Sequence, residues 1–442
     1  MNGYGEVLYN TSRDFFVPLQ GEEKYCTEGF KELALIYGAT EASYRKTAAL
    51  LNRARHQEDG GTPSRTLRET TEQEGVMIQE HLEQKASRLF QAHGFTREGQ
   101  PQAALVAPLA PPPSLVGEES VPVGLPSNVG PAQGQSNLLP SPLPDEDAQA
   151  VRDLSEEGVG TKTLNALVTA GGLSEQSRSD MVKNPVSYED AQEAVNISVD
   201  EVGAKKQKET REQKPHGPPA KKKRAYIHNT VIHVEHGGKL YMLNGYGVPS
   251  VLRLLLAFLL ENQLVSHPFI FFVDGHSLYA AVVQFFSWHT KVSVILDWYH
   301  LRKKCRELLS MALKGSKLRN AVLEKLMPLL WYGLVDQAID YLSTLPAAQI
   351  KNQDERLHLL TYLSKNRPMI PVYAVRRKLG LRNSSNRGEK ANDLLVAERQ
   401  KHNGMSWSKS GSVALASVTA LKQNQEYPKW FRARELEFKL AS

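Results

Sequence analysis

Residues 269–304 read FIFFVDGHSLYAAVVQFFSWHTKVSVILDWYHLRKK and contain two short apolar runs, Phe269–Val273 and Val292–Leu296. Each run is rich in aromatic and β-branched side chains and has the length of a buried strand. An aspartate follows each run, Asp274 the first and Asp297 the second. Because the segment between the runs has helical spacing, we predict a β-strand, crossover helix and β-strand unit. Open α/β sheets bind their ligands at the C-terminal ends of such strands, so both aspartates are candidate site residues.

Three further strands are predicted before this unit, the last two joined into a hairpin by Gly237-Gly238: residues 196–205, 225–235 and 239–243. Alternation along the first of them places Asp200 on one face and Glu201 on the other. Residues 249–262 then form an apolar helix. The order strand, strand, strand, helix, strand, helix, strand is that of the ribonuclease-H-like fold. We therefore predict an α/β protein in which an antiparallel meander is extended by parallel strands.

The N-terminal part of the chain, residues 29–94, has helical spacing interrupted by a polar break. The second of its helices starts at Thr62-Pro63-Ser64, with a proline at the first turn. Arg65 and Arg68 in that turn can reach phosphates or base edges, as in a helix-turn-helix module. An ordinary helical hairpin with solvated arginines fits the same spacing. A further amphipathic helix is predicted over residues 79–91.

Changes in composition predict how the chain is divided. A Pro-, Gly- and Ser-rich stretch is typical of a linker, and a long run with helical spacing and no strand pattern indicates an all-helical insertion. The predicted parts are an N-terminal helical DNA-binding region (1–100), the linker (101–145), a small helical segment (146–195), an α/β catalytic domain (196–312 and 380–425) and the helical insertion (313–379).

The composition of the 442-residue chain limits the classes of function. Its formal net charge of +6 suits a polyanionic partner but does not identify one. The two cysteines, Cys26 and Cys305, are far apart in sequence, which argues against a disulfide framework or a zinc site and fits a reducing compartment. The most apolar run, residues 251–260, is too short to span a bilayer and contains Arg253. We expect a cytoplasmic protein without a membrane partner.

Three acidic residues have the distribution that two-metal phosphodiester chemistry needs. Such chemistry uses two Mg²⁺ ions about 3.5–4 Å apart, bound by carboxylates on rigid elements. Asp200 lies within the first strand, Asp274 follows the fourth strand and Glu389 opens a late helix. An aspartate after a strand is also a common turn or capping residue. Glu201 and Asp393 are the alternative ligands, although Glu201 points to the opposite face of its strand.

Five segments resemble one known family: SVDEVGAKKQKETR, YIHNTVIHVE, FFVDGHSLY, ILDWYHLRKKC and LRNSSNRGEKANDLLVAERQKHNGMSWSKSGSVALA. In these segments the chain is similar to bacterial insertion-sequence transposases of the acidic-triad (DDE) type, close to the Lre group and related to the Mutator-like superfamily. The resemblance implies a ribonuclease-H-like catalytic core with a helical insertion before the third acidic residue. It places the triad on Asp200, Asp274 and Glu389, as ligands of two Mg²⁺ ions for which Mn²⁺ can substitute.

The resemblance also changes the role expected of Asp297. The superfamily has an aspartate and a histidine separated by two residues, which here are Asp297 and His300. They become an accessory pair beside the cleaved bond. Other residues near His300 and Glu389 are candidate DNA contacts, with a solvated surface or core packing as the alternative: Arg302, Lys303, Lys304, Arg387, Lys390, Trp298 and Trp407.

The function expected from the resemblance is transposition of DNA. The N-terminal region would bind the terminal inverted repeats of an insertion sequence, and the triad would catalyse cleavage and strand transfer. The expected partners are double-stranded DNA and further copies of the chain, in the bacterial cytoplasm and at the nucleoid when DNA is bound. Two alternatives remain: a ribonuclease-H-like nuclease or resolvase without strand transfer, and a non-catalytic DNA-binding protein derived from a transposase.

Overall fold

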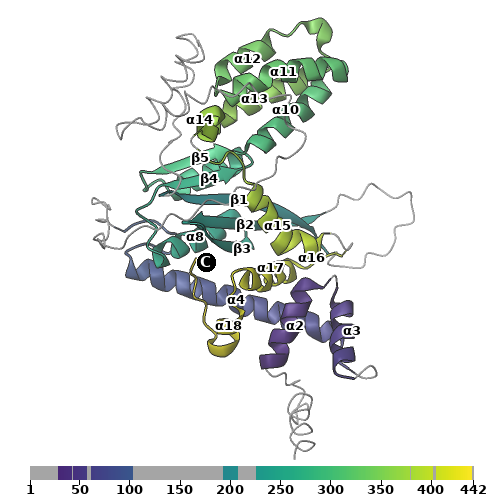
Figure 1. Cartoon of the computed structure of the whole chain (residues 1–442), viewed down its shortest axis with the longest axis vertical. Helices are drawn as coiled ribbons and strands as arrows, with labels where there is room; N and C mark the ends of the chain where they lie inside the picture. The colour runs from purple at the N-terminus through teal and green to yellow at the C-terminus, as the bar shows by residue number, and fades with distance from the viewer. Residues whose placement is uncertain are drawn as a thin grey trace, which may run out of the picture. The chain divides into compact units, whose positions relative to one another are not determined.

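A computed structural model describes residues 28–41, 43–56, 61–102, 193–207, 225–378, 380–401 and 405–440 (Figure 1). Nearly all of the predicted linker and of the predicted small helical segment lies outside these residues. The chain forms two compact units. The first comprises Met1–Gln102, Ser198–Val265 and Asn386–Ser442, and the second comprises Ala103–Ile197 and Ser266–Ser385. Each unit is therefore assembled from segments that are distant in sequence.

The protein is a mixed α/β protein, as predicted, with a five-stranded sheet in the order β3-β2-β1-β4-β5 (Figure 1). Strands β2 and β3 pair antiparallel, whereas β4 and β5 pair parallel. The sheet is thus mixed. Its strands are β1 (Val195–Lys205), β2 (Tyr226–His236), β3 (Lys239–Tyr246), β4 (Phe269–Val273) and β5 (Val292–Leu296).

The predicted hairpin is confirmed. His236 on β2 lies opposite Lys239 on β3, so the loop contains only Gly237 and Gly238. Their φ angles are 57° and 76°, and a two-residue loop with positive φ at both positions matches the twist of the strands that it joins. Because side chains with a Cβ adopt this conformation at a cost, the glycine pair explains why the chain turns here.

The strand–helix–strand unit is confirmed as well. Strand β4 is followed by helix α9 (His276–Phe285) and then by β5, and all five residues of β4 are buried. In the parallel register Val273 lies opposite Leu296. Asp274 and Asp297 therefore follow two paired residues at the same end of neighbouring strands.

Helices pack around the part of the sheet that belongs to the first unit. The longest is α4, and Gly75 near its middle packs directly on α17. A Cβ at Gly75 would lie 2.5 Å from the Ala414 Cα of α17. The helices are α2 (Glu28–Thr40), α3 (Tyr44–Ala54), α4 (Ser64–Ala92), α8 (Val248–Glu261), α15 (Asn386–Asn392), α16 (Glu398–Gln400), α17 (Lys409–Gln423) and α18 (Tyr427–Ala433).

One expectation about this region was wrong. Residues 79–91 continue α4 instead of forming a separate helix, so that α4 has 29 residues. Glycine inside a helix usually weakens it, which made a break near Gly75 plausible from sequence. Here the missing side chain permits the close approach of α17. Packing against another helix therefore outweighs the low helix propensity of Gly75.

The second unit carries the helices that follow β5. The described residues from 313 to 378 contain helices and no strand. The elements are α10 (Trp298–Ala312), α11 (Ser316–Trp331), α12 (Val335–Ser343), the 3-10 helix η1 (Ala347–Gln349), α13 (Gln353–Asn366), the 3-10 helix η2 (Arg367–Met369) and α14 (Tyr373–Lys378). Of the helices in the described ranges, none is both long and apolar enough to cross a membrane.

Candidate functional site

Asp200 is held in place on β1 by two hydrogen bonds. Its Oδ1 accepts from the backbone N–H of Glu201 at 2.7 Å. Its Oδ2 accepts from the Nδ2 of Asn392, a residue 192 positions away in sequence. The Asp200 side chain is half-buried, whereas Glu201 is exposed. The alternation predicted along β1 therefore separates the two carboxylates, and Asp200 is the one that faces α15.

Helix α15 carries Glu389 and is tied to the sheet at both ends. Arg387 near its start forms an ion pair with Glu235 on β2, and Asn392 at its end bonds Asp200 on β1. Residues three apart in a helix share a face, so Glu389 lies on the same face of α15 as Asn392. The structure thus brings the helix of the third predicted acid against the strand of the first.

The backbone directly after α15 is unusual. Residues Asp393–Ala397 form the π-helix η3, and such π turns occur frequently at functional sites. The wider turn changes the direction of the side chains that come after Asn392, and Asp393 is exposed. Within the described chain the Oδ1 of Asn392 is buried and has no hydrogen-bond partner. Buried amide oxygens are nearly always satisfied, so this atom points to a missing neighbour such as a water or a cation.

The residues fit a magnesium site in their chemistry. The carboxylates of Asp200 and Glu389 and the amide oxygen of Asn392 belong to the first unit, and the carboxylate of Asp274 belongs to the second. All are hard oxygen donors of the kind that Mg²⁺ prefers. Among the described residues, however, no group of three or more His, Cys, Asp or Glu side chains is arranged to hold a metal ion. The metal role of the triad therefore stays a prediction.

In the second unit, Asp274 and Asp297 occupy different environments. Asp274 is exposed, and Gly275 separates it from the start of α9. Asp297 is only 1% exposed and is the N-cap residue of α10. Its Oδ1 accepts from the backbone N–H of His300 at 2.9 Å, and its Oδ2 accepts from both the Oγ (3.0 Å) and the backbone N–H of Ser385.

Asp297 and His300, the accessory pair predicted from the resemblance, lie close together. The Nδ1 of His300 is 3.6 Å from the Oδ1 of Asp297, and the His300 side chain is 24% exposed. Asp297 thus fixes the first turn of α10 and lies beside the imidazole. Ser385, which completes the arrangement, was not among the predicted residues. The only sequence signal for Ser385 is its place in the polar break LRNSSNRG just before Glu389.

Aromatic and phenolic side chains surround this end of the second unit. The Trp298 ring lies 4.9 Å, centroid to centroid, from both Trp331 and Tyr373. The Tyr373 hydroxyl donates to the Leu296 carbonyl at 2.7 Å. Burial raises the pKa of Tyr373 well above its ordinary value, and the negative charge of Asp297 raises it further. Burial also raises the pKa of Tyr362, and Cys305, Asp274 and Asp297 add to the effect.

The two tryptophans predicted to stack on bases both pack against protein side chains. Trp407 in the first unit is 5% exposed, and its Nε1 donates to the Gln400 carbonyl at 3.2 Å. The Arg399 guanidinium lies 5.3 Å from its ring centroid. Trp298 is half-buried among the rings described above. Both positions match the core-packing alternative, and stacking of either ring on a base stays a prediction.

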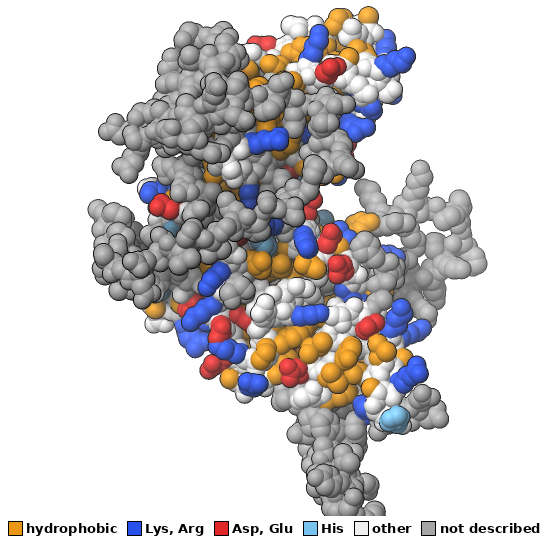
Figure 2. All heavy atoms as spheres, in the orientation of Figure 1, with side chains coloured by type: hydrophobic (Ala, Val, Ile, Leu, Met, Phe, Trp, Pro, Cys, Tyr) orange, Lys and Arg blue, Asp and Glu red, His pale blue; other side chains and the backbone are white. Residues whose placement is uncertain are grey.

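The basic residues predicted to contact DNA lie on helix surfaces. In the first turn of α4, Arg65 Nε is 2.6 Å from Glu69 Oε1, and Arg68 lies 3.9 Å from both Glu69 and Glu72. Exposed pairs of this kind contribute little to stability, so both guanidinium groups can exchange partners. On the face shown in Figure 2, basic side chains are interspersed with acidic and apolar ones. The remaining predicted contacts are Arg302 (half-buried) and Lys303, Lys304, Arg387 and Lys390 (exposed).

No family model matches the chain, and neither the curated proteins nor the solved structures include a match.

Proposed function

We propose that this protein is a DNA transposase of the acidic-triad type, with a ribonuclease-H-like catalytic core and Asp200, Asp274 and Glu389 as the ligands of two Mg²⁺ ions. The strand order β3-β2-β1-β4-β5 supports the proposed core, because it places the hairpin strands on one side of β1 and the parallel pair on the other. Asp200 lies within β1, and Asp274 directly follows β4.

The observation that carries the proposal is the contact between β1 and α15. Asn392 donates a hydrogen bond to Asp200, and Glu389 lies one turn earlier on the same face of α15. Two acids that are far apart in sequence thus belong to elements that touch. A solvated surface helix needs no such buried amide beside a strand carboxylate.

Each residue has a role that follows from its environment. The hydrogen bonds from Glu201 and Asn392 fix the Asp200 carboxylate in one orientation, which reduces the reorganisation needed when a ligand binds. Asp274 is exposed at the end of its strand, where a large substrate can reach it. Asp297 holds the first turn of α10 and thereby positions His300, whose imidazole can donate a hydrogen bond to a DNA phosphate.

The metal ions would supply a nucleophile at neutral pH and stabilise the charge that develops on the phosphate during cleavage. The protein would supply the carboxylates that hold them, the oriented His300 and basic side chains that position the DNA backbone. Arg302, Lys303 and Lys304 follow His300 on α10, and Lys390 follows Glu389 on α15. Phosphate contacts of this kind fix the register of DNA without reading its sequence.

Single substitutions in the triad test the proposal. Purified protein is incubated with Mg²⁺ and a DNA that carries the ends flanking its gene, and cleaved and joined products are separated on a gel. We expect D200N, D274N and E389Q each to lose at least about 100-fold in rate, because each removes a ligand charge. Addition of EDTA should abolish the reaction, and Mn²⁺ should restore it.

Matched controls separate a catalytic role from general loss of charge. E201Q alters the carboxylate next to Asp200 on the exposed side of β1, and D393N alters an exposed acid four residues after Glu389. Both should retain nearly full activity. Full activity of E389Q would reject the triad. Cleavage without joined product would favour a nuclease or resolvase, and DNA binding without any metal-dependent cleavage would favour a non-catalytic binding protein.

A further inference from the structure

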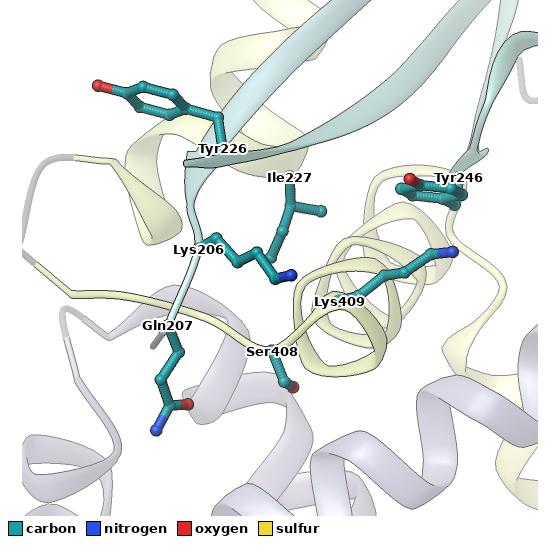
Figure 3. A pocket seen from close by; sticks show the side chains of 7 residues that line it. All are labelled: Lys206, Gln207, Tyr226, Ile227, Tyr246, Ser408 and Lys409. Carbon is teal, nitrogen blue, oxygen red and sulfur yellow. The ribbon is translucent and has the colours of Figure 1, made fainter. Parts of the chain in front are cut away.

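The first unit contains a cavity of about 480 Å³ at one end of strands β1, β2 and β3, and no member of the proposed triad lines it (Figure 3). Side chains from two strands, from the segment after β1 and from the start of one helix line it. They include Lys206 and Gln207 after β1, Tyr226 at the start of β2, Tyr246 at the end of β3, and Ser408 and Lys409 at the start of α17. Its volume lies in the range of pockets that enclose a nucleotide-sized group.

The charge around the cavity favours an anionic ligand. Among the described residues that line it, the charged ones are Lys206 and Lys409, and none is acidic. In Figure 3 the Lys206 side chain extends across the middle of the cavity. Ser408 caps α17 by accepting a hydrogen bond from Gly411 N–H at 3.0 Å, so the partially positive end of that helix also lies here.

Two tyrosines also line the cavity, and one of them lies against a lysine. Tyr226 and Tyr246 are each 48% exposed, in a sheet whose other aromatic side chains are mostly buried. The Lys409 ammonium lies 3.5 Å from the centroid of the Tyr246 ring, a cation–π contact that orients both side chains. Exposed aromatic rings next to basic groups are the usual means of binding unpaired nucleic acid, since bases stack on the rings and phosphates approach the cations.

We infer that this cavity binds an unpaired stretch of DNA, with its phosphates near Lys206 and Lys409 and a base stacked on Tyr226 or Tyr246. The inference rests on the proposed function for its ligand class, DNA. Lys206 lies six positions after Asp200 along the same chain direction and on the same face of the strand, about 20 Å away. On that face the residues between them, Val202 and Ala204, are buried against helices, so the cavity is a separate site at the end of the strand. A duplex offers no free base faces to the tyrosines.

Binding of labelled oligonucleotides tests this inference. The full chain is titrated into fluorescein-labelled oligo(dT) and, separately, into a labelled duplex of equal length, in EDTA so that no cleavage occurs. We expect the double variant Y226L/Y246L to bind oligo(dT) roughly 5- to 100-fold more weakly than wild type, since each base stacked on an aromatic ring contributes at this level. Its affinity for the duplex should be unchanged.

The lysines give a second, independent measurement. K206Q/K409Q should bind oligo(dT) more weakly and should lower the slope of log K against log[salt] by about 1.4, because each lost phosphate contact removes roughly 0.7 for a single strand. Y37L and K239Q serve as controls, since Tyr37 and Lys239 are exposed in the same unit but do not line the cavity. Both controls should bind as wild type does.

The outcomes separate this inference from the proposed function. Unchanged oligo(dT) binding by Y226L/Y246L, with an unchanged melting temperature, would overturn the inference whether or not the protein cleaves DNA. An equal loss of affinity for oligo(dT) and duplex would also overturn it. A loss of affinity for oligo(dT) alone would support the binding of unpaired DNA in the cavity. That conclusion would hold even if the triad variants showed that the protein does not cut DNA.

Discussion

Two neighbouring strand ends, those of β4 and β5, carry aspartates in opposite environments. Val273 and Leu296 are paired in the parallel register, so Asp274 and Asp297 come next at the same end of the sheet. Asp274 is exposed, whereas Asp297 is buried and accepts hydrogen bonds from His300 and Ser385. The same local pattern, an apolar run followed by aspartate, thus produces one accessible carboxylate and one enclosed carboxylate.

The difference comes from where the next helix begins relative to each aspartate. Helix α10 begins immediately after Asp297, which makes that residue its N-cap. Helix α9 begins only after Gly275, so Asp274 stays outside the helix end. A residue 88 positions away, Ser385, then closes over Asp297. In this chain the aspartate directly before a helix is therefore enclosed, and the aspartate separated from its helix by Gly275 stays accessible.

The largest effect on stability is expected from Asp297→Ala. The substitution removes the cap of α10 and leaves the buried N–H of Ser385 without an acceptor. Loss of a cap costs about 1 kcal/mol, and each unsatisfied buried donor costs about 1–3 kcal/mol. We expect the free energy of unfolding to fall by about 3 kcal/mol, measured by urea denaturation followed by circular dichroism. A fall below about 1 kcal/mol would contradict a structural role for Asp297.

A smaller effect is expected from Ser385→Ala. Only the 3.0 Å hydrogen bond from the Ser385 hydroxyl to Asp297 is lost, because the backbone N–H still donates to the same carboxylate. We expect a decrease of about 1 kcal/mol in the same denaturation experiment. Ser384→Ala is the matched control and should leave the unfolding curve unchanged. Equal changes in the free energy of unfolding for Ser385→Ala and Ser384→Ala would show that the hydrogen bond to Asp297 adds no stability.

The smallest effect is expected from Asp274→Asn. An exposed side chain outside a helix cap contributes little, so the free energy of unfolding should change by less than about 0.5 kcal/mol. The same variant should lose DNA cleavage if the proposed triad is correct. Its unfolding curve should therefore overlay that of the wild type while its activity differs. A loss of stability comparable to that of Asp297→Ala would remove the distinction between the two strand ends.

Local patterns in the sequence were sufficient to predict the strands and the tight turn. The runs at 269–273 and 292–296 and the Gly237-Gly238 turn were predicted correctly because their conformations depend on neighbouring residues. Contacts over long sequence distances were not predictable. Ser385 and Asn392 reach their aspartates only after the chain has folded. The resemblance indicated which acids to examine, but it contained no information about these partners.

Two features of the helices also escaped local reasoning. The sequence predicted a separate helix over residues 79–91, yet α4 runs on through Gly75 because Ala414 of α17 packs against the glycine. The helix α18 lies in a stretch that gave no clear pattern, and its residues Tyr427, Trp430 and Phe431 are buried by packing within the first unit. Trp430 also donates to Glu74 of α4 at 2.7 Å. In both cases a partner distant in sequence decides the local structure.

The packing of α4 on α17 determines when the first unit can finish folding during synthesis. Gln79 on α4 donates to Ser417 on α17 at 2.6 Å, so the first unit joins two helices whose bonded residues are 338 positions apart. At a synthesis rate of roughly 5–20 residues per second, α4 leaves the ribosome about 15–60 s before its partner is made. A chain that stops before α17 lacks that partner. Assembly of the first unit therefore has to wait until α17 has been synthesised.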